Sequence, residues 1–116
     1  MTHVEQNLPI ATDGPHMHDL VGADLRALAA LGGEEAAVRL AERKKIGVER
    51  YGQPLQAHNG RDALRDAREE VLDLLVYLRQ AIEEGRGDLG ELYEVALRLA
   101  CQLIRRSTSK DRSIGS

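Results

Sequence analysis

The segment 59–78 holds the side chains of this sequence that are best suited to chemistry. It contains five carboxylates and three arginines and runs into an apolar stretch. Wound as an α-helix, it places a polar stripe one turn apart along one side: Asp66, Glu70, Asp73 and Tyr77. The stripe beside it is apolar and faces the core: Val71, Leu74, Leu75, Leu78, Ala81 and Ile82. Leu72 and Val76 lie on the far side of the acids, so we expect these carboxylates to be only partly in water.

Clustered carboxylates of this kind require positive charge nearby. Like charges one turn apart destabilise a helix by roughly 0.2–0.5 kcal/mol per pair, and partial burial strengthens the repulsion. Two sources of compensation fit the pattern. Arg61, Arg65 and Arg68 can form salt bridges with the acids, or a divalent cation can be held by the carboxylate oxygens.

The composition predicts a single all-α domain. The chain has 116 residues, no Trp, no Phe and three Tyr, and it is rich in Leu, Ala, Arg and Glu, which favour helices. Strand-forming aromatic and β-branched residues are scarce. A chain of this length builds only a modest core, so association between copies would help to stabilise it.

Several classes of protein are disfavoured by charge and cysteine content. The net charge is −3, whereas a binder of nucleic acid polymers needs a basic face. Neither a signal peptide nor an apolar run of transmembrane length is present, so we expect no membrane partner and a cytoplasmic location. The single cysteine, Cys101, excludes an internal disulfide and is expected to be a small buried hydrophobe.

Glycine and proline positions divide the chain into four helices. We expect a flexible or loosely docked arm over residues 1–16, a domain over 17–106 and a fraying tail over 107–116. Short connections between the helices are typical of a four-helix bundle. The fourth helix is expected to bury Leu92, Ala96, Leu99, Ala100 and Leu103. The expected helices span 18–31, 34–50, 61–84 and 89–106.

A second carboxylate source lies on the helix expected over 34–50. Glu35, Glu42 and Glu49 recur every seven residues, so they share one side of the helix, and Glu42 is in the middle. If this helix packs antiparallel to the next, Glu42 can face the turn of Glu70 and Asp73. Three carboxylates from two helices would form a Mg²⁺ site.

Such a site suits phosphate chemistry, because Mg²⁺ keeps open positions for water and for phosphate oxygens. A further carboxylate, Asp66 or Glu69, can orient or deprotonate the attacking water. The cationic candidates for phosphate binding are Arg61 and Lys45. The candidates for contact with a base or sugar are Tyr51, Asn59, Tyr77 and Gln80.

The acid-rich helix and the loop before it resemble the MazG-like all-α nucleoside triphosphate pyrophosphohydrolases. The segment Glu70-Val71-Leu72-Asp73 matches the ExxD half of the family's metal motif, and its apolar continuation follows. The loop 50–55, Arg-Tyr-Gly-Gln-Pro-Leu, and the segment 59–62, Asn-Gly-Arg-Asp, also look like members of this group. The resemblance covers about residues 34–84. It implies a four-helix core, Mg²⁺ or Mn²⁺ as cofactor, a homodimer or homotetramer, and cleavage of a nucleoside triphosphate to monophosphate and pyrophosphate.

One departure from the family pattern leaves two alternatives. The ExxE half is missing from the second helix, because Arg39 stands three residues before Glu42 and Ile46 three residues before Glu49. Either Glu42 completes the site together with Asp66 and Glu69, or catalysis has been reduced. In the second case, the chain would be a non-catalytic nucleotide-binding or sensing protein, or a helical interaction protein derived from this fold.

Overall fold

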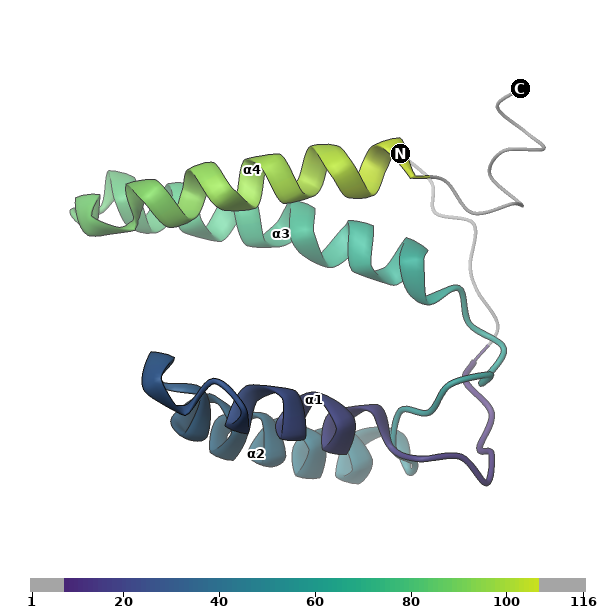
Figure 1. Cartoon of the computed structure of the whole chain (residues 1–116). Helices are drawn as coiled ribbons and strands as arrows, with labels where there is room; N and C mark the ends of the chain where they lie inside the picture. Colours follow the sequence, from purple (N-terminus) through teal and green to yellow (C-terminus); the bar gives the residue numbers. More distant parts are fainter. Residues whose placement is uncertain (1–7, 107–116) are drawn as a thin grey trace. The chain divides into compact units, whose positions relative to one another are not determined.

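The structure is a computed structural model that describes residues 8–106, and within these residues all regular elements are helical (Figure 1). The expectation of an all-α chain with four α-helices is therefore confirmed. The outer parts of the predicted arm and tail, residues 1–7 and 107–116, lie outside the described residues. The helices are α1 (Met17–Arg26), η1 (Ala29–Leu31), α2 (Gly33–Tyr51), α3 (Ala63–Glu83), η2 (Gly87–Leu89) and α4 (Gly90–Arg105).

The chain divides into two compact units, Met1–Arg61 and Asp62–Ser116, called unit 1 and unit 2. In unit 1, α1 and α2 form an antiparallel hairpin. At one end of it Lys44 Nζ lies 2.9 Å from Asp19 Oδ1, and at the other Arg26 Nε lies 3.4 Å from Glu34 Oε1. These ion pairs join the start of each helix to the end or later turns of the other.

Glycine allows the chain to reverse between the helices of unit 1. The expected helix over 18–31 is too long, because α1 ends at Arg26 and the chain tightens into η1. Gly32 then takes a left-handed conformation, with φ of 82°. Gly33 packs so closely on Leu25 that a Cβ atom there would lie 1.8 Å from the Leu25 carbonyl oxygen.

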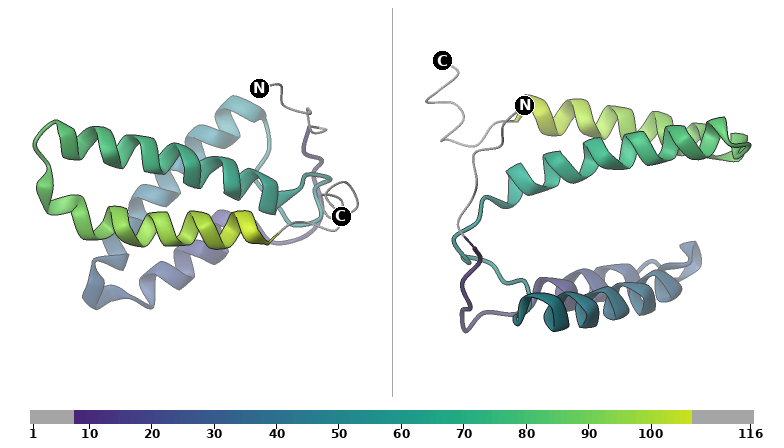
Figure 2. Two further views of the ribbon diagram at one scale, coloured as in Figure 1. Left: turned by 90° about the horizontal axis from the view of Figure 1, so that it is seen from above. Right: turned by 180° about the vertical axis from the view of Figure 1, so that it is seen from behind.

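Unit 2 is a second antiparallel hairpin, in which α3 and α4 run side by side (Figure 2). Asp62 caps the start of α3, where its Oδ1 accepts a hydrogen bond of 3.1 Å from the Arg65 backbone N–H. Arg68 Nη1 donates to the backbone oxygen of Arg106 at 3.1 Å, which joins the start of α3 to the end of α4. The buried apolar residues are small: Val71, Ala96 and Ala100.

Several expectations about the core helices are wrong. Leu92 is 59% exposed and Leu99 is 48% exposed, although both were expected to be buried. Leu74 on α3 is exposed as well, and so is Cys101. The face of α4 that meets α3 is centred on Ala96 and Ala100. Leu92 and Leu99 lie roughly 60–80° around the helix from the centre of that face, so α3 leaves them exposed.

The described part of the predicted arm, residues 8–16, is docked along the loop that follows α2. The Ile10 backbone N–H donates to the Asn59 backbone oxygen at 2.9 Å, and the Gln53 side chain donates to the Pro9 backbone oxygen. His16 forms an isolated antiparallel bridge with Gln56. None of the helices within residues 8–106 has the length and apolar character needed to cross a membrane.

Candidate functional site

The acids of α3 lie on one helix, and their surroundings differ. Asp66 is half-buried, whereas Glu69, Glu70 and Asp73 are exposed, so these three lie more in water than the sequence pattern predicts. The apolar residues expected to flank them leave them accessible, because Leu72 and Val76 are themselves exposed.

On α3, the acids include those that pair with an arginine, such as Glu69 and Glu83, and the pair Glu70 and Asp73. Arg65 Nε lies 3.9 Å from Glu69 Oε1, and Arg79 Nη2 lies 2.6 Å from Glu83 Oε1. Within residues 8–106, no ion pair or side-chain hydrogen bond involves Glu70 or Asp73. The nearby arginines therefore neutralise the neighbours of this pair and not the pair itself.

Glu70 and Asp73 are three residues apart on a regular helix, so their side chains project from the same face. Tyr77, one turn further on, is 67% exposed. The two carboxylates on this exposed face supply oxygen ligands of the type that hard divalent cations prefer. This face of α3 is the part of the predicted site that unit 2 brings together.

Unit 1 holds the other predicted residues of α2. Glu42 and Lys45 are exposed and three residues apart. Glu35, on the same side, pairs with Arg39 at 3.0 Å, whereas no ion pair or side-chain hydrogen bond within residues 8–106 involves Glu42. Because Glu42 belongs to unit 1 and Glu70 and Asp73 to unit 2, the three-carboxylate site stays a prediction. No group of three His, Cys, Asp or Glu side chains arranged to hold a metal occurs in the described part of the chain.

The loop after α2 carries the remaining predicted contacts. Tyr51 is 71% exposed at the end of α2, and the Arg50 guanidinium lies 5.9 Å from the centre of its ring. Asn59 is 7% exposed, and its Oδ1 accepts a hydrogen bond of 3.2 Å from the Arg61 backbone N–H. Arg61 is half-buried. The Asn59 side-chain oxygen therefore shapes the turn that leads to Arg61, in which His58 and Gly60 both have positive φ.

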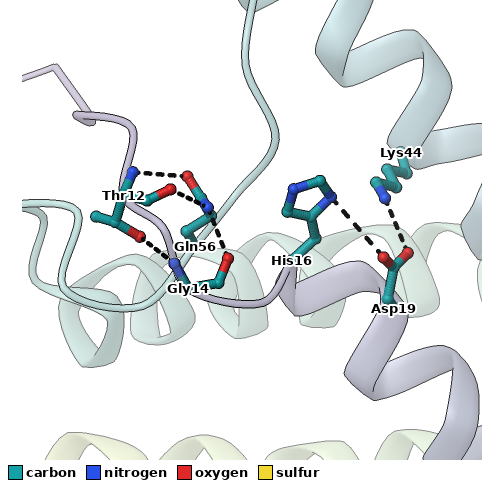
Figure 3. A network of polar contacts seen from close by, with 6 residues as sticks. All are labelled: Thr12, Gly14, His16, Asp19, Lys44 and Gln56. Atoms are coloured by element: carbon teal, nitrogen blue, oxygen red, sulfur yellow. Dashed lines mark hydrogen bonds and ion pairs between the residues drawn. The ribbon is translucent and has the colours of Figure 1, made fainter.

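A polar network that the sequence did not reveal lies beside this loop (Figure 3). Gln56 is 5% exposed and bonds to Thr12 and Gly14. At the start of α1, Asp19 accepts a hydrogen bond from Lys44 and lies 3.8 Å from His16 Nδ1. The hydrogen bond from Lys44 holds the pKa of Asp19 below its usual value. The partners of Gln56, and Lys44 as a partner of Asp19, are distant in sequence, so no local pattern could have identified them.

Comparison of this chain with protein-family models, with curated proteins and with solved structures finds no match.

Proposed function

We propose that this chain is a nucleoside triphosphate pyrophosphohydrolase of the MazG-like type that depends on Mg²⁺ or Mn²⁺. The observation that carries the proposal is the exposed pair Glu70 and Asp73, which no ion pair within residues 8–106 neutralises. Two adjacent carboxylates without a cationic partner are unfavourable on an isolated helix. A bound divalent cation removes this repulsion, whereas the salt-bridge alternative requires arginine partners, and this pair has none among residues 8–106.

The proposed residues have separate roles. Glu42, Glu70 and Asp73 hold the cation, which supplies charge neutralisation for the phosphates. Asp66 or Glu69 orients a water and accepts its proton as the water attacks the α-phosphorus. The bond between the α-phosphorus and the α,β-bridging oxygen breaks, and monophosphate and pyrophosphate leave. Arg61 and Lys45 contact the phosphates, and Tyr51, Asn59 and Tyr77 contact the base or sugar.

This function also requires the finer architecture that the resemblance implies. In the proposal, the hairpins pack into a four-helix bundle that brings Glu42 to Glu70 and Asp73, and two or four copies associate. The exposed leucines and valines on α1, α3 and α4 support such packing, because surfaces of this type are usually covered. A triphosphate substrate fits the predicted cytoplasmic location.

The direct test is analysis of the products from a panel of canonical and modified nucleoside triphosphates incubated with the full chain and Mg²⁺. We expect monophosphate and pyrophosphate, with the activity lost in EDTA and in the Glu70→Gln/Asp73→Asn double variant. Glu83→Gln is the matched control, because Glu83 lies on the same helix but pairs with Arg79. Full activity in the double variant, or no turnover of any triphosphate by the folded chain, would overturn the proposal.

A second candidate function is a helical interaction protein, which the outer face of α4 favours. Leu92, Val95 and Leu99 share one side of this helix and are 59%, 63% and 48% exposed. Apolar residues at this spacing are typical of a helix that packs against a partner. Size-exclusion chromatography with light scattering, comparing the wild type with Val95→Lys, tests this face. A monomeric wild type would argue against self-association through it.

A further inference from the structure

Gln56 is a buried polar side chain whose hydrogen-bonding groups are all used by one distant segment. Its Oε1 accepts from the Thr12 backbone N–H at 2.9 Å. Its Nε2 donates to the backbone oxygens of Thr12 at 2.6 Å and Gly14 at 2.8 Å (Figure 3). One amide therefore pairs three backbone groups of a segment that lies more than forty residues earlier in the chain.

These bonds matter because the backbone of this segment forms no helix or sheet. A side-chain amide that both accepts from and donates to Thr12 replaces the pairing that a neighbouring strand would provide. At 5% exposure, little water can substitute for it. Loss of the Gln56 amide would leave two carbonyls and one N–H without these partners.

Contacts on both sides of Gln56 extend the attachment. Before it, the Gln53 side chain donates to the Pro9 backbone oxygen, and the Met17 backbone N–H donates to the Leu55 oxygen at 2.8 Å. After it, the Ile10 N–H donates to the Asn59 oxygen at 2.9 Å. Residues 9–16, which we call the strap, are thus bonded along the loop 53–59.

The strap connects to a proposed substrate contact through Asn59. The backbone oxygen of Asn59 accepts from Ile10 in the strap, and its side-chain Oδ1 accepts from the Arg61 N–H at 3.2 Å. Asn59 is 7% exposed, so it is held from both sides. A displacement of the strap therefore acts on the turn that sets the position of Arg61.

We infer that Gln56 is a positioning residue, which clamps the strap to the loop 53–59 and thereby holds Asn59 and Arg61 in place for the triphosphate. In this role Gln56 does not itself touch the substrate, and its effect on catalysis is indirect. Its kinetic part rests on the proposed function, whereas its structural part does not.

Amide hydrogen exchange of the full chain tests the structural part. Gln56→Met keeps the length of the side chain but removes its donors and acceptor. We expect exchange at Ile10, Thr12, Met17 and Arg61 to accelerate together by about tenfold or more, while Ala96 and Ala100 in unit 2 are unchanged. Gln102→Met, an exposed glutamine on α4, should leave all of these rates unchanged. Acceleration at Thr12 alone would overturn the inference, because the strap would then not move as a unit.

A second pair of variants keeps the test decisive if Gln56→Met does not fold. Thr12→Pro removes the backbone N–H that donates a hydrogen bond to Gln56 Oε1, and it leaves the Gln56 side chain unchanged. Thr12→Val removes the hydroxyl that accepts from the Gly14 N–H but keeps the backbone bonds. We expect Thr12→Pro to accelerate exchange at Ile10, Met17 and Arg61, and Thr12→Val not to do so. Equal exchange in both variants would count against the clamp.

Kinetics test the positioning part. We expect Gln56→Met to raise KM for the triphosphate by about fivefold or more with a smaller change in kcat, because binding contacts are loosened. An unchanged KM in a variant with faster exchange overturns the positioning role. Absence of turnover in the wild type would reject the proposed function and with it this kinetic role, while the exchange data would still decide whether the strap exists.

Discussion

The carbonyl oxygen of Leu25 lies 1.8 Å from the position that a Cβ atom would take at Gly33, so only glycine fits where α1 and α2 meet. The Leu25 carbonyl carbon and the Leu28 oxygen lie 2.8 and 2.9 Å from the same position. All three are backbone atoms, which cannot move aside as a side chain can. The turn of unit 1 therefore depends on this close approach.

Gly33→Ala should destabilise unit 1 by about 3 kcal/mol, because the new methyl group forces the helices apart. Gly47→Ala is the matched control on the same helix, since nothing lies within 4 Å of its Cβ position. There we expect a gain of about 0.5–1 kcal/mol from reduced chain entropy and better helix propensity. Urea unfolding measures both, and similar effects at the two glycines would contradict the close-packing argument.

The Asp19–Lys44 pair should make the stability of unit 1 depend on acid. The hydrogen bond from Lys44 lowers the pKa of Asp19 in the folded chain. The folded state then binds fewer protons than the unfolded state. The stabilisation is complete above the unfolded-state pKa of about 3.9 and is lost as the pH falls through the lower, folded-state value.

Asp19→Asn removes this titrating group. The stability of the variant should therefore fall less steeply with decreasing pH than the stability of the wild type. Thermal unfolding between neutral and strongly acidic pH, monitored by circular dichroism, provides the comparison. Asp19 is exposed and Lys44 is half-buried, so salt screens the pair in part, and the difference should shrink at high ionic strength. Parallel pH profiles for the two proteins would show that the pair does not contribute.

The cap at the start of α3 should be measurable by substitution. Asp62→Ala removes the acceptor for the Arg65 N–H and should cost about 1 kcal/mol or more. Asp62→Ser keeps a capping oxygen and should retain most of the stability. Equal losses in chemical unfolding of the two variants would assign the effect to the charge of Asp62 and not to the cap.

In the proposed function a divalent cation takes part in nucleotide binding, so its removal should weaken that binding. With Mg²⁺ and an α,β-methylene triphosphate analogue at 100 times its Kd, stabilisation of about 2.7 kcal/mol should raise Tm by roughly 10 °C. EDTA and the Glu70→Gln/Asp73→Asn variant should abolish the part of the shift that depends on Mg²⁺. The same shift with and without EDTA would exclude a cation from the bound state.

The helix positions could be predicted well from the sequence, because the spacing of apolar residues and the presence of glycine at helix ends are local signals. The helix expected over 34–50 is observed as Gly33–Tyr51, and that expected over 61–84 as Ala63–Glu83. Glycine in a left-handed conformation ends α2 at Gly52, and the aspartate cap starts α3. The polar stripe of Glu70, Asp73 and Tyr77 follows from the same helical geometry.

Burial was predicted less well, because it depends on which face meets a partner. Leu92 and Leu99 have the spacing of core residues, but Ala96 and Ala100 form the contact of α4 with α3. Small residues permit close helix packing, and the larger ones beside them remain exposed. Periodicity identifies the apolar face of a helix, but it does not show which residues of that face are buried against a partner.

By itself, the sequence determined that the chain is helical, where its helices lie, and which acids share a face of α3, since each of these depends on neighbours within a few residues. Only the tertiary structure decided that α1 ends at Arg26, before the predicted end at residue 31, with Gly33 packed against Leu25. It also decided that Lys44 pairs with Asp19 and that Gln56 bonds to residues 12 and 14. The first feature joins two neighbouring helices, and the other two join atoms 25 to 44 residues apart in the sequence. Their free energy arises from close packing and from hydrogen bonds between segments, and it exists only once the chain has brought those segments together.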